Sequence, residues 1–126
     1  MVDLEALFSG APAPAPVALD PPVPVDDLVE AAAGRGWATL VVTVGDKAAT
    51  LEAFAEAGRF PDWVGRNWDA LQDALGDLSW LGPVDGYLVV LRGTAGVEPD
   101  PVLDSVLARA ATEWADRGTP FVTVVE

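Results

Sequence analysis

The chain of 126 residues contains no histidine and no cysteine. Without imidazole groups, histidine-based acid–base catalysis and histidine metal ligation are excluded. Without thiols, cysteine nucleophiles, disulfides, thiolate zinc centres and iron–sulfur clusters are excluded as well. What remains is the chemistry of carboxylates, hydroxyls and a few basic groups, and we expect the protein to use no cofactor.

Basic residues are scarce: 7 Lys and Arg stand against 20 Asp and Glu, which gives a formal net charge of −13. Nucleic-acid backbones and anionic membranes both attract clusters of Lys and Arg, so the charge balance argues against either as a ligand. It favours a basic partner instead. Hydrophobic residues make up 51% of the chain, which is enough to form the core of one globular domain.

The sequence also lacks a long apolar run. No stretch approaches the roughly 18 apolar residues that a membrane span needs. Residues 1–10 hold two acids and no base, so they lack the positively charged start and the apolar stretch of a secretory signal. We therefore expect a cytoplasmic protein that does not contact membranes.

Proline is concentrated near the beginning of the chain. Six prolines fall within residues 11–24, and proline at this density favours extended backbone. We therefore predict a Pro/Ala-rich N-terminal extension over residues 1–25, acting as a tail or linker, and an α/β domain over residues 26–126. The extension has the pattern for a short edge strand at Val17–Leu19. Leu4, Leu7 and Phe8 have the spacing of one amphipathic helical turn, but a frayed terminus is the interpretation that we favour for them.

Three short apolar runs, separated by helical patterns, indicate the fold class. The runs are rich in β-branched residues and are typical of strands buried on both faces; they cover Trp37–Val44, Tyr87–Leu91 and Phe121–Val125. Helices are expected from caps at Asp26 and Asp27, from Asp46 to Gly58, within Arg66–Leu78, and from Pro101 to Arg117. This alternation predicts an α/β fold: a small three-stranded parallel sheet, with its strands in chain order, packed by helices.

The segment from Phe60 to Gly82 combines three of the five tryptophans with four acids. As a helix, it would place one apolar stripe towards the sheet, formed by Trp68, Leu71, Leu75 and Leu78. On the opposite face it would place three carboxylates at i, i+4 and i+8, those of Asp69, Asp73 and Asp77. Such like-charge pairs destabilise a helix by about 0.2–0.5 kcal/mol each, and only Arg66 is near enough in sequence to offset them. The alternative to a functional face is an ordinary solvated face on an acidic protein.

The loop before this helix carries Trp63, which lies off the apolar stripe. A large aromatic side chain beside an acidic helix fits a protein-recognition surface, because Trp and Tyr dominate interface energetics. The alternative is that Trp63 packs the loop against the core, as we expect Trp68 and Trp80 to do. Gly65 in the same loop suggests a backbone conformation that other residues disfavour.

The segment FPDWVGRNWDALQDALGDLSWLG resembles the barstar family, small cytoplasmic inhibitors of secreted microbial ribonucleases. The resemblance extends more weakly from Trp37 to Val125, where the order of strands and helices also agrees, and residues 1–25 lie outside it. The positions that match the family pattern are Phe60, Pro61, Gly65, Asn67, Asp69, Ala70, Leu71, Asp73 and Leu75.

The resemblance implies inhibition by occlusion, in which the acidic helix and the preceding loop plug the ribonuclease active site. Asp73 matches the family's central carboxylate, which occupies the phosphate-binding site, and Asp69 matches an acid that pairs with a nuclease arginine. Trp63 stands where the family commonly has Tyr, and Gln72 stands where the best-known inhibitor of the family has Trp, so the identity of the target nuclease stays open. The implied partner-binding residues are Trp63, Gly65, Asn67, Asp69, Gln72, Asp73 and Glu113, the last from the final long helix.

The sequence thus favours an inhibitor or immunity protein, expected to be monomeric, whose partner is a basic secreted ribonuclease or a nuclease toxin domain. A binding or regulatory module of the same fold with another partner is the alternative. An enzyme with paired carboxylates, such as a glycosidase, is disfavoured because acids four apart on one convex helix do not flank a substrate. A metal site at Asp69, Asp73 and Asp77 is disfavoured because side chains on one straight helix cannot surround an ion.

Overall fold

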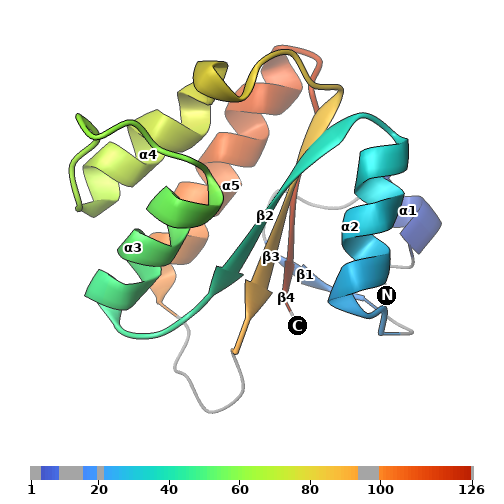
Figure 1. Ribbon diagram of the computed structural model, residues 1–126, viewed down its shortest axis with the longest axis horizontal. Coiled ribbons are helices and arrows are strands. Elements are labelled where there is room, and N and C mark those ends of the chain that lie inside the picture. Colours follow the sequence, from blue (N-terminus) through green and yellow to red (C-terminus); the bar gives the residue numbers. More distant parts are fainter. Residues whose placement is uncertain (1–3, 9–15, 20–21, 94–99, 126) are drawn as a thin grey trace.

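A parallel sheet lies between two layers of helices in the computed structural model, which describes residues 4–8, 16–19, 22–93 and 100–125 (Figure 1). Helices α3, α4 and α5 cover one face of the sheet, and α1 and α2 cover the other. The helices are α1 (Leu4–Phe8), α2 (Val25–Gly34), α3 (Lys47–Ala57), α4 (Trp68–Asp77) and α5 (Pro101–Asp116), with a 3-10 turn, η1, at Ser79–Leu81. The strands are β1 (Val17–Ala18), β2 (Trp37–Thr43), β3 (Gly86–Arg92) and β4 (Phe121–Val125).

The sheet has four parallel strands in the order β1-β4-β3-β2. The predicted neighbours β2, β3 and β4 lie side by side in chain order, as expected. The prediction of three strands is wrong by one, because β1 pairs with the outer edge of β4 through Val17 opposite Val124. A two-residue strand between prolines is too short to give an alternating pattern, although the unpaired edge of β4 offers it hydrogen-bonding groups.

Both faces of the sheet are buried, which explains the continuous apolar runs. On β3, Tyr87 and Val89 face the core under α3, α4 and α5. Leu88 and Val90 face the smaller core under α1 and α2. A strand covered on both sides has no polar face, so its sequence loses the alternation of a half-exposed strand.

The described parts of residues 1–25 pack on the sheet. Leu7 of α1 is fully buried in the smaller core, and the ring of Phe8 meets Trp37 edge-on, with 4.9 Å between ring centroids. The guanidinium of Arg35 lies 4.3 Å from the centroid of the Phe8 ring. The predicted edge strand is therefore confirmed. The expectation of a frayed terminus is wrong for Leu4–Phe8, which form the helical alternative because Leu7 and Phe8 have a core to pack against. The proline-rich residues 9–15 and 20–21 lie outside the described part, and a domain boundary at residue 25 stays a prediction.

The other helix limits follow from their caps. Asp46 caps α3 and Asp100 caps α5, because each side chain accepts a hydrogen bond from a backbone N–H in the first turn. The expected start of α2 needs a correction: Pro24 takes the cap position without a side-chain hydrogen bond. Asp26 and Asp27 fall in the first turn instead, where the helix dipole favours their charge.

Thr123 supplies a test of the packing. It is 2% exposed, and its hydroxyl has no hydrogen-bond partner among the described residues. A buried unsatisfied hydroxyl costs about 1 kcal/mol or more. We expect Thr123→Val to raise the free energy of unfolding by about 1 kcal/mol, seen as a higher midpoint in thermal unfolding. The exposed Thr43→Val is the matched control and should change little, and a destabilised Thr123→Val would show that the hydroxyl has a partner.

Candidate protein-binding face

The limits and the orientation of helix α4 are determined by the contacts at its two ends and by one stripe of buried side chains. At its start the side-chain oxygen of Asn67 accepts a hydrogen bond of 2.8 Å from the backbone N–H of Ala70. Leu71, Ala74 and Leu75 are buried against the main core. The predicted helix and its apolar stripe are thus confirmed, and the amide oxygen of Asn67 serves as the cap that starts the helix.

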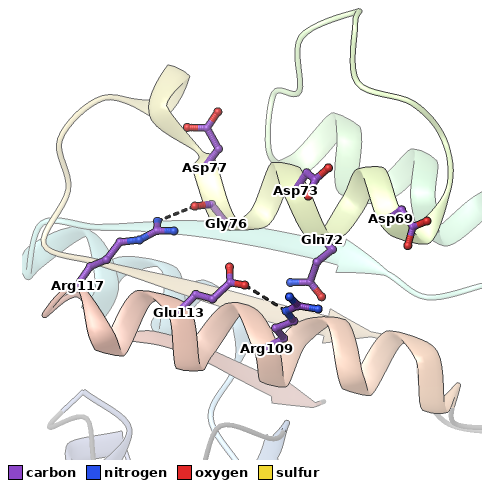
Figure 2. A pocket seen from close by; sticks show the side chains of 8 residues that line it. All are labelled: Asp69, Gln72, Asp73, Gly76, Asp77, Arg109, Glu113 and Arg117. Atoms are coloured by element: carbon purple, nitrogen blue, oxygen red, sulfur yellow. Dashed lines mark hydrogen bonds and ion pairs between the residues drawn. The ribbon is translucent and has the colours of Figure 1, made fainter.

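At its end, α4 is held by donors from α5. The last carbonyls of a helix have no partner within the helix. Here the indole N–H of Trp114 donates to the carbonyl of Leu75 at 2.7 Å, and the guanidinium of Arg117 donates to that of Gly76 at 2.6 Å (Figure 2). Leu78 then ends the helix in the left-handed conformation, with φ of 51°. These contacts fix α4 against α5.

The three carboxylates of α4 form one exposed row, as predicted. Asp69, Asp73 and Asp77 are all exposed, and Asp73 and Asp77 point away from α5 (Figure 2). Arg66, the base near enough in sequence to offset this charge, binds Glu52 instead, with its Nε atom 3.0 Å from a carboxylate oxygen. Within the part of the chain that the structure describes, Asp69 and Asp73 form no hydrogen bond through their side chains and no ion pair.

A groove of about 500 Å³ runs between α4 and α5. It brings Glu113, which the resemblance to the barstar family implied as a partner contact, beside the acidic row, although the two lie about 40 residues apart along the chain. The sequence analysis missed two arginines, Arg109 of α5 and Arg117 at its end. Each is four residues from Glu113, so the three side chains lie on the same helix face. The groove is lined by Asp69, Gln72, Asp73, Gly76, Asp77, Arg109, Glu113 and Arg117.

Gln72 and Glu113 line this groove from α4 and α5, respectively. The side chain of Gln72 points towards α5 (Figure 2), and its amide nitrogen is buried with no acceptor among the described residues. One carboxylate oxygen of Glu113 binds the guanidinium of Arg109 at 3.2 Å. The other would lie 2.9 Å from a Cβ atom at position 76, so the glycine there gives this carboxylate its room.

A second hollow, of about 370 Å³, lies between α4 and the loop before it. Its lining includes Trp63, Val64 and Gly65 from the loop and Asp73 and Asp77 from α4. Because these two carboxylates also line the groove between α4 and α5, they stand on a ridge between the two hollows. We use the name acidic face for the surface formed by Trp63, the two hollows and the three carboxylates of α4, those of Asp69, Asp73 and Asp77.

Trp63 is 75% exposed, so the prediction of a surface aromatic is confirmed and packing against the core is wrong for it. Its ring meets Trp80 edge-on, with 6.1 Å between centroids. Trp80 is half-buried against the main core, and its indole N–H donates to the carbonyl of Gly58 at 2.9 Å. Trp68 is also half-buried against this core. Trp63 is therefore presented to solvent on a fixed aromatic support.

The expectation for Gly65 needs a correction. Its φ is not in the left-handed region that favours glycine. A Cβ atom at this position would lie 3.3 Å from the amide nitrogen of Asn67 and 3.5 Å from the Cβ atom of Ala70. Glycine is favoured here because the loop passes close to the first turn of α4, so the residue shapes the loop that carries Trp63.

Tyr87 lies under the groove, where its ring packs 4.7 Å from that of Trp114. Burial raises the pKa of its hydroxyl above the ordinary value, the positive charge of Arg117 lowers it, and the carboxylate of Asp77 raises it. The net result is a raised pKa, so Tyr87 is neutral at pH 7 and adds no charge to the acidic face.

Neither a metal centre nor a membrane span is found in the described residues. They contain no group of three or more acidic, histidine or cysteine side chains placed to hold a metal ion. None of their helices has the length and apolar character needed to cross a membrane. The functional question therefore turns on the acidic face.

An exposed aromatic residue thus lies beside the two unpaired carboxylates of Asp69 and Asp73, an arrangement that is typical of protein-recognition surfaces. The family described as Barstar (barnase inhibitor) matches residues 39–126, and the chain belongs to that family. The match includes β2 from its third residue and all of α3, α4, α5 and the acidic face. No curated protein matches the chain.

The contact between α4 and α5 yields a stability prediction. Trp114→Phe removes the indole donor and leaves the carbonyl of Leu75 without its partner. The control is Trp68→Phe, which makes the same change in size at another half-buried residue. The indole N–H of Trp68 has no acceptor among the described residues. We expect Trp114→Phe to lower the free energy of unfolding by about 1–2 kcal/mol more than Trp68→Phe. Denaturant unfolding of both variants measures this difference, and equal losses would mean that the hydrogen bond adds nothing.

Proposed function

We propose that this protein inhibits a basic microbial ribonuclease by placing the acidic face in the active site of the nuclease. Membership of a family described as barnase inhibitor supports the class of function. The observation on which the proposal depends is the ridge of Asp73 and Asp77 between two hollows, with Trp63 exposed beside it. Such a ridge can enter a cleft while its flanks receive side chains from the walls of that cleft.

The chemistry of the two partners is complementary. A ribonuclease gathers cationic side chains to bind the phosphates of RNA, and a carboxylate supplies similar charge without a bond that can be cleaved. Asp73 would take the central cationic pocket, and Asp69 would pair with a neighbouring arginine. Because the backbone of α4 is held at both ends, little conformational entropy is lost when it binds.

The other predicted residues would act in different ways. Trp63 would stack on the nuclease surface, and Gln72 and Glu113 would line the edge of the contact from the groove. Gly65 and Asn67 would act indirectly, since the first shapes the loop and the second caps α4. The formal net charge of −13 would speed the encounter with a basic protein, an effect that falls as salt is added.

The location and assembly of the protein belong to the same proposal. A cytoplasmic inhibitor would protect the cell from a nuclease made for secretion or received from a neighbouring cell. A monomer would leave the acidic face open to its partner. The alternative, a regulatory module with a partner that is not a nuclease, predicts no loss of RNA cleavage when the protein is mixed with basic microbial ribonucleases.

Substitution of the two central acids tests the proposal. We expect Asp73→Ala to weaken inhibition of barnase, or of another basic microbial ribonuclease that the wild type inhibits, by several kcal/mol and Asp69→Ala to weaken it less. The barnase–barstar pair is one of the complexes from which this scale was measured, so the magnitude does not come from this chain. Residual RNA cleavage in titrations gives the affinity. Glu30→Ala, an equal change of charge on α2 behind the sheet, is the control, and inhibition by both Asp variants at the wild-type level would contradict the proposed site.

Trp63 allows binding to be separated from folding. Because its side chain is 75% exposed, Trp63→Ala should change the free energy of unfolding by less than about 1 kcal/mol. Affinity for the nuclease should fall about tenfold or more, as expected for an aromatic anchor in an interface. Val102→Ala, at an exposed apolar residue on α5, should leave affinity unchanged. Unchanged affinity of Trp63→Ala would remove the aromatic residue from the proposed contact.

A further inference from the structure

The groove between α4 and α5 contains an ion pair between two residues of α5, Arg109 and Glu113. It involves neither Asp69 nor Asp73, the carboxylates of α4 that we propose to bind the partner. The Nε atom of Arg109 lies 3.2 Å from the Oε1 atom of Glu113, one turn along α5. The side chain of Arg109 is 71% exposed and that of Glu113 is 36% exposed. The cation is thus at the rim of the groove, and the carboxylate is further inside.

Only one carboxylate oxygen of Glu113 has a hydrogen-bonding partner among the described residues. Oε1 pairs with Arg109, and Oε2 lies over Gly76, where a Cβ atom would come within 2.9 Å of it. Arg109 lies beside Glu113 in the groove (Figure 2), so a basic side chain that approaches this carboxylate also meets the positive charge of Arg109. To bind Oε1, it has to replace Arg109 as the counter-ion.

The two arginines of the groove differ in what holds them. Arg117 donates to the carbonyl of Gly76 and stacks over the ring of Trp114, 4.5 Å from its centroid, so its position is tied to the packing of α4 on α5. Arg109 is held only through its Nε atom among the described residues, and its two terminal nitrogens have no partner there. Arg109 is therefore the cation that can move or be removed without loosening α4.

We propose that Arg109 is a specificity-determining residue that withholds Glu113 from the partner and limits the attraction of the α4–α5 groove for basic proteins. This rests on the proposed function, since it assumes that the acidic face binds a basic protein. The physical reason is direct: Arg109 neutralises one of the four carboxylates of the groove and repels an incoming cation over the same few ångströms. A nuclease whose cations avoid this end of the groove binds without penalty, and one with a lysine or arginine there is disfavoured.

Arg109→Gln tests the repulsion, with barnase as the probe. Glutamine suits an exposed helix position, so the fold should be kept. We expect about three- to tenfold tighter binding at low salt, mainly through faster association, and a smaller gain at high salt. Arg35→Gln, an equal change of charge at the residue that follows α2 behind the sheet, should give a clearly smaller gain. Equal gains from both variants would reduce the effect to net charge and overturn the proposal.

A double-mutant cycle tests whether Glu113 is withheld. Glu113→Gln should weaken barnase binding more in the Arg109→Gln background than in the wild type, because there Arg109 no longer occupies Oε1 of the carboxylate. If Glu113→Gln has the same effect in both backgrounds, Arg109 and Glu113 act as independent charges and the proposal is wrong.

Asp73→Ala separates the failure of this inference from failure of the proposed function. If Asp73→Ala weakens barnase binding but Arg109→Gln leaves it unchanged or weakens it, only the role of Arg109 is contradicted. If Asp73→Ala binds as the wild type does, or the wild type binds neither barnase nor any other basic microbial ribonuclease of a panel at low salt, the proposed contact and the role of Arg109 are contradicted together.

Discussion

The acidic face depends on one contact, the capping of the carbonyl end of α4 by α5. Two backbone carbonyls that the helix leaves unpaired receive the indole of Trp114 and the guanidinium of Arg117. A row of like charges on α4 works against the helix that carries it, and Asp77 lies at the end of the helix, where the dipole disfavours a negative charge. Donors from a neighbouring helix, together with the buried stripe below, hold the row in place.

This contact also shapes the charge around α4. Arg117 donates a hydrogen bond to the backbone of α4 and stacks on the ring of Trp114, and Arg109 forms an ion pair with Glu113. Within the described residues, these two basic groups, which line the same groove, therefore form no ion pair with the carboxylates of α4. Asp69 and Asp73 thus keep their negative charge available for a partner. A surface of this kind attracts a basic protein at long range and can choose among such proteins by where their cations fall.

The sequence predicted most of what depends on local pattern: three buried strands, their helices, the stripe of Leu71 and Leu75, and an exposed Trp63. It could not predict what depends on distant neighbours. The pairing of β1 with β4 needs an open sheet edge, and the ion pair of Arg66 with Glu52 needs the loop to fold over α3. Gly65 appeared to require a special φ, and it owes its identity to the close approach of the first turn of α4.

The central claim is that the acidic face takes the place of RNA in the active site of a ribonuclease. The most direct measurement is the inhibition of barnase, and of a panel of other basic microbial ribonucleases, at increasing concentrations of a small RNA substrate. The account predicts competitive inhibition, with an apparent inhibition constant that rises in proportion to substrate concentration for at least one of the nucleases. An inhibition constant that does not depend on substrate, or no inhibition of any of them, would contradict it.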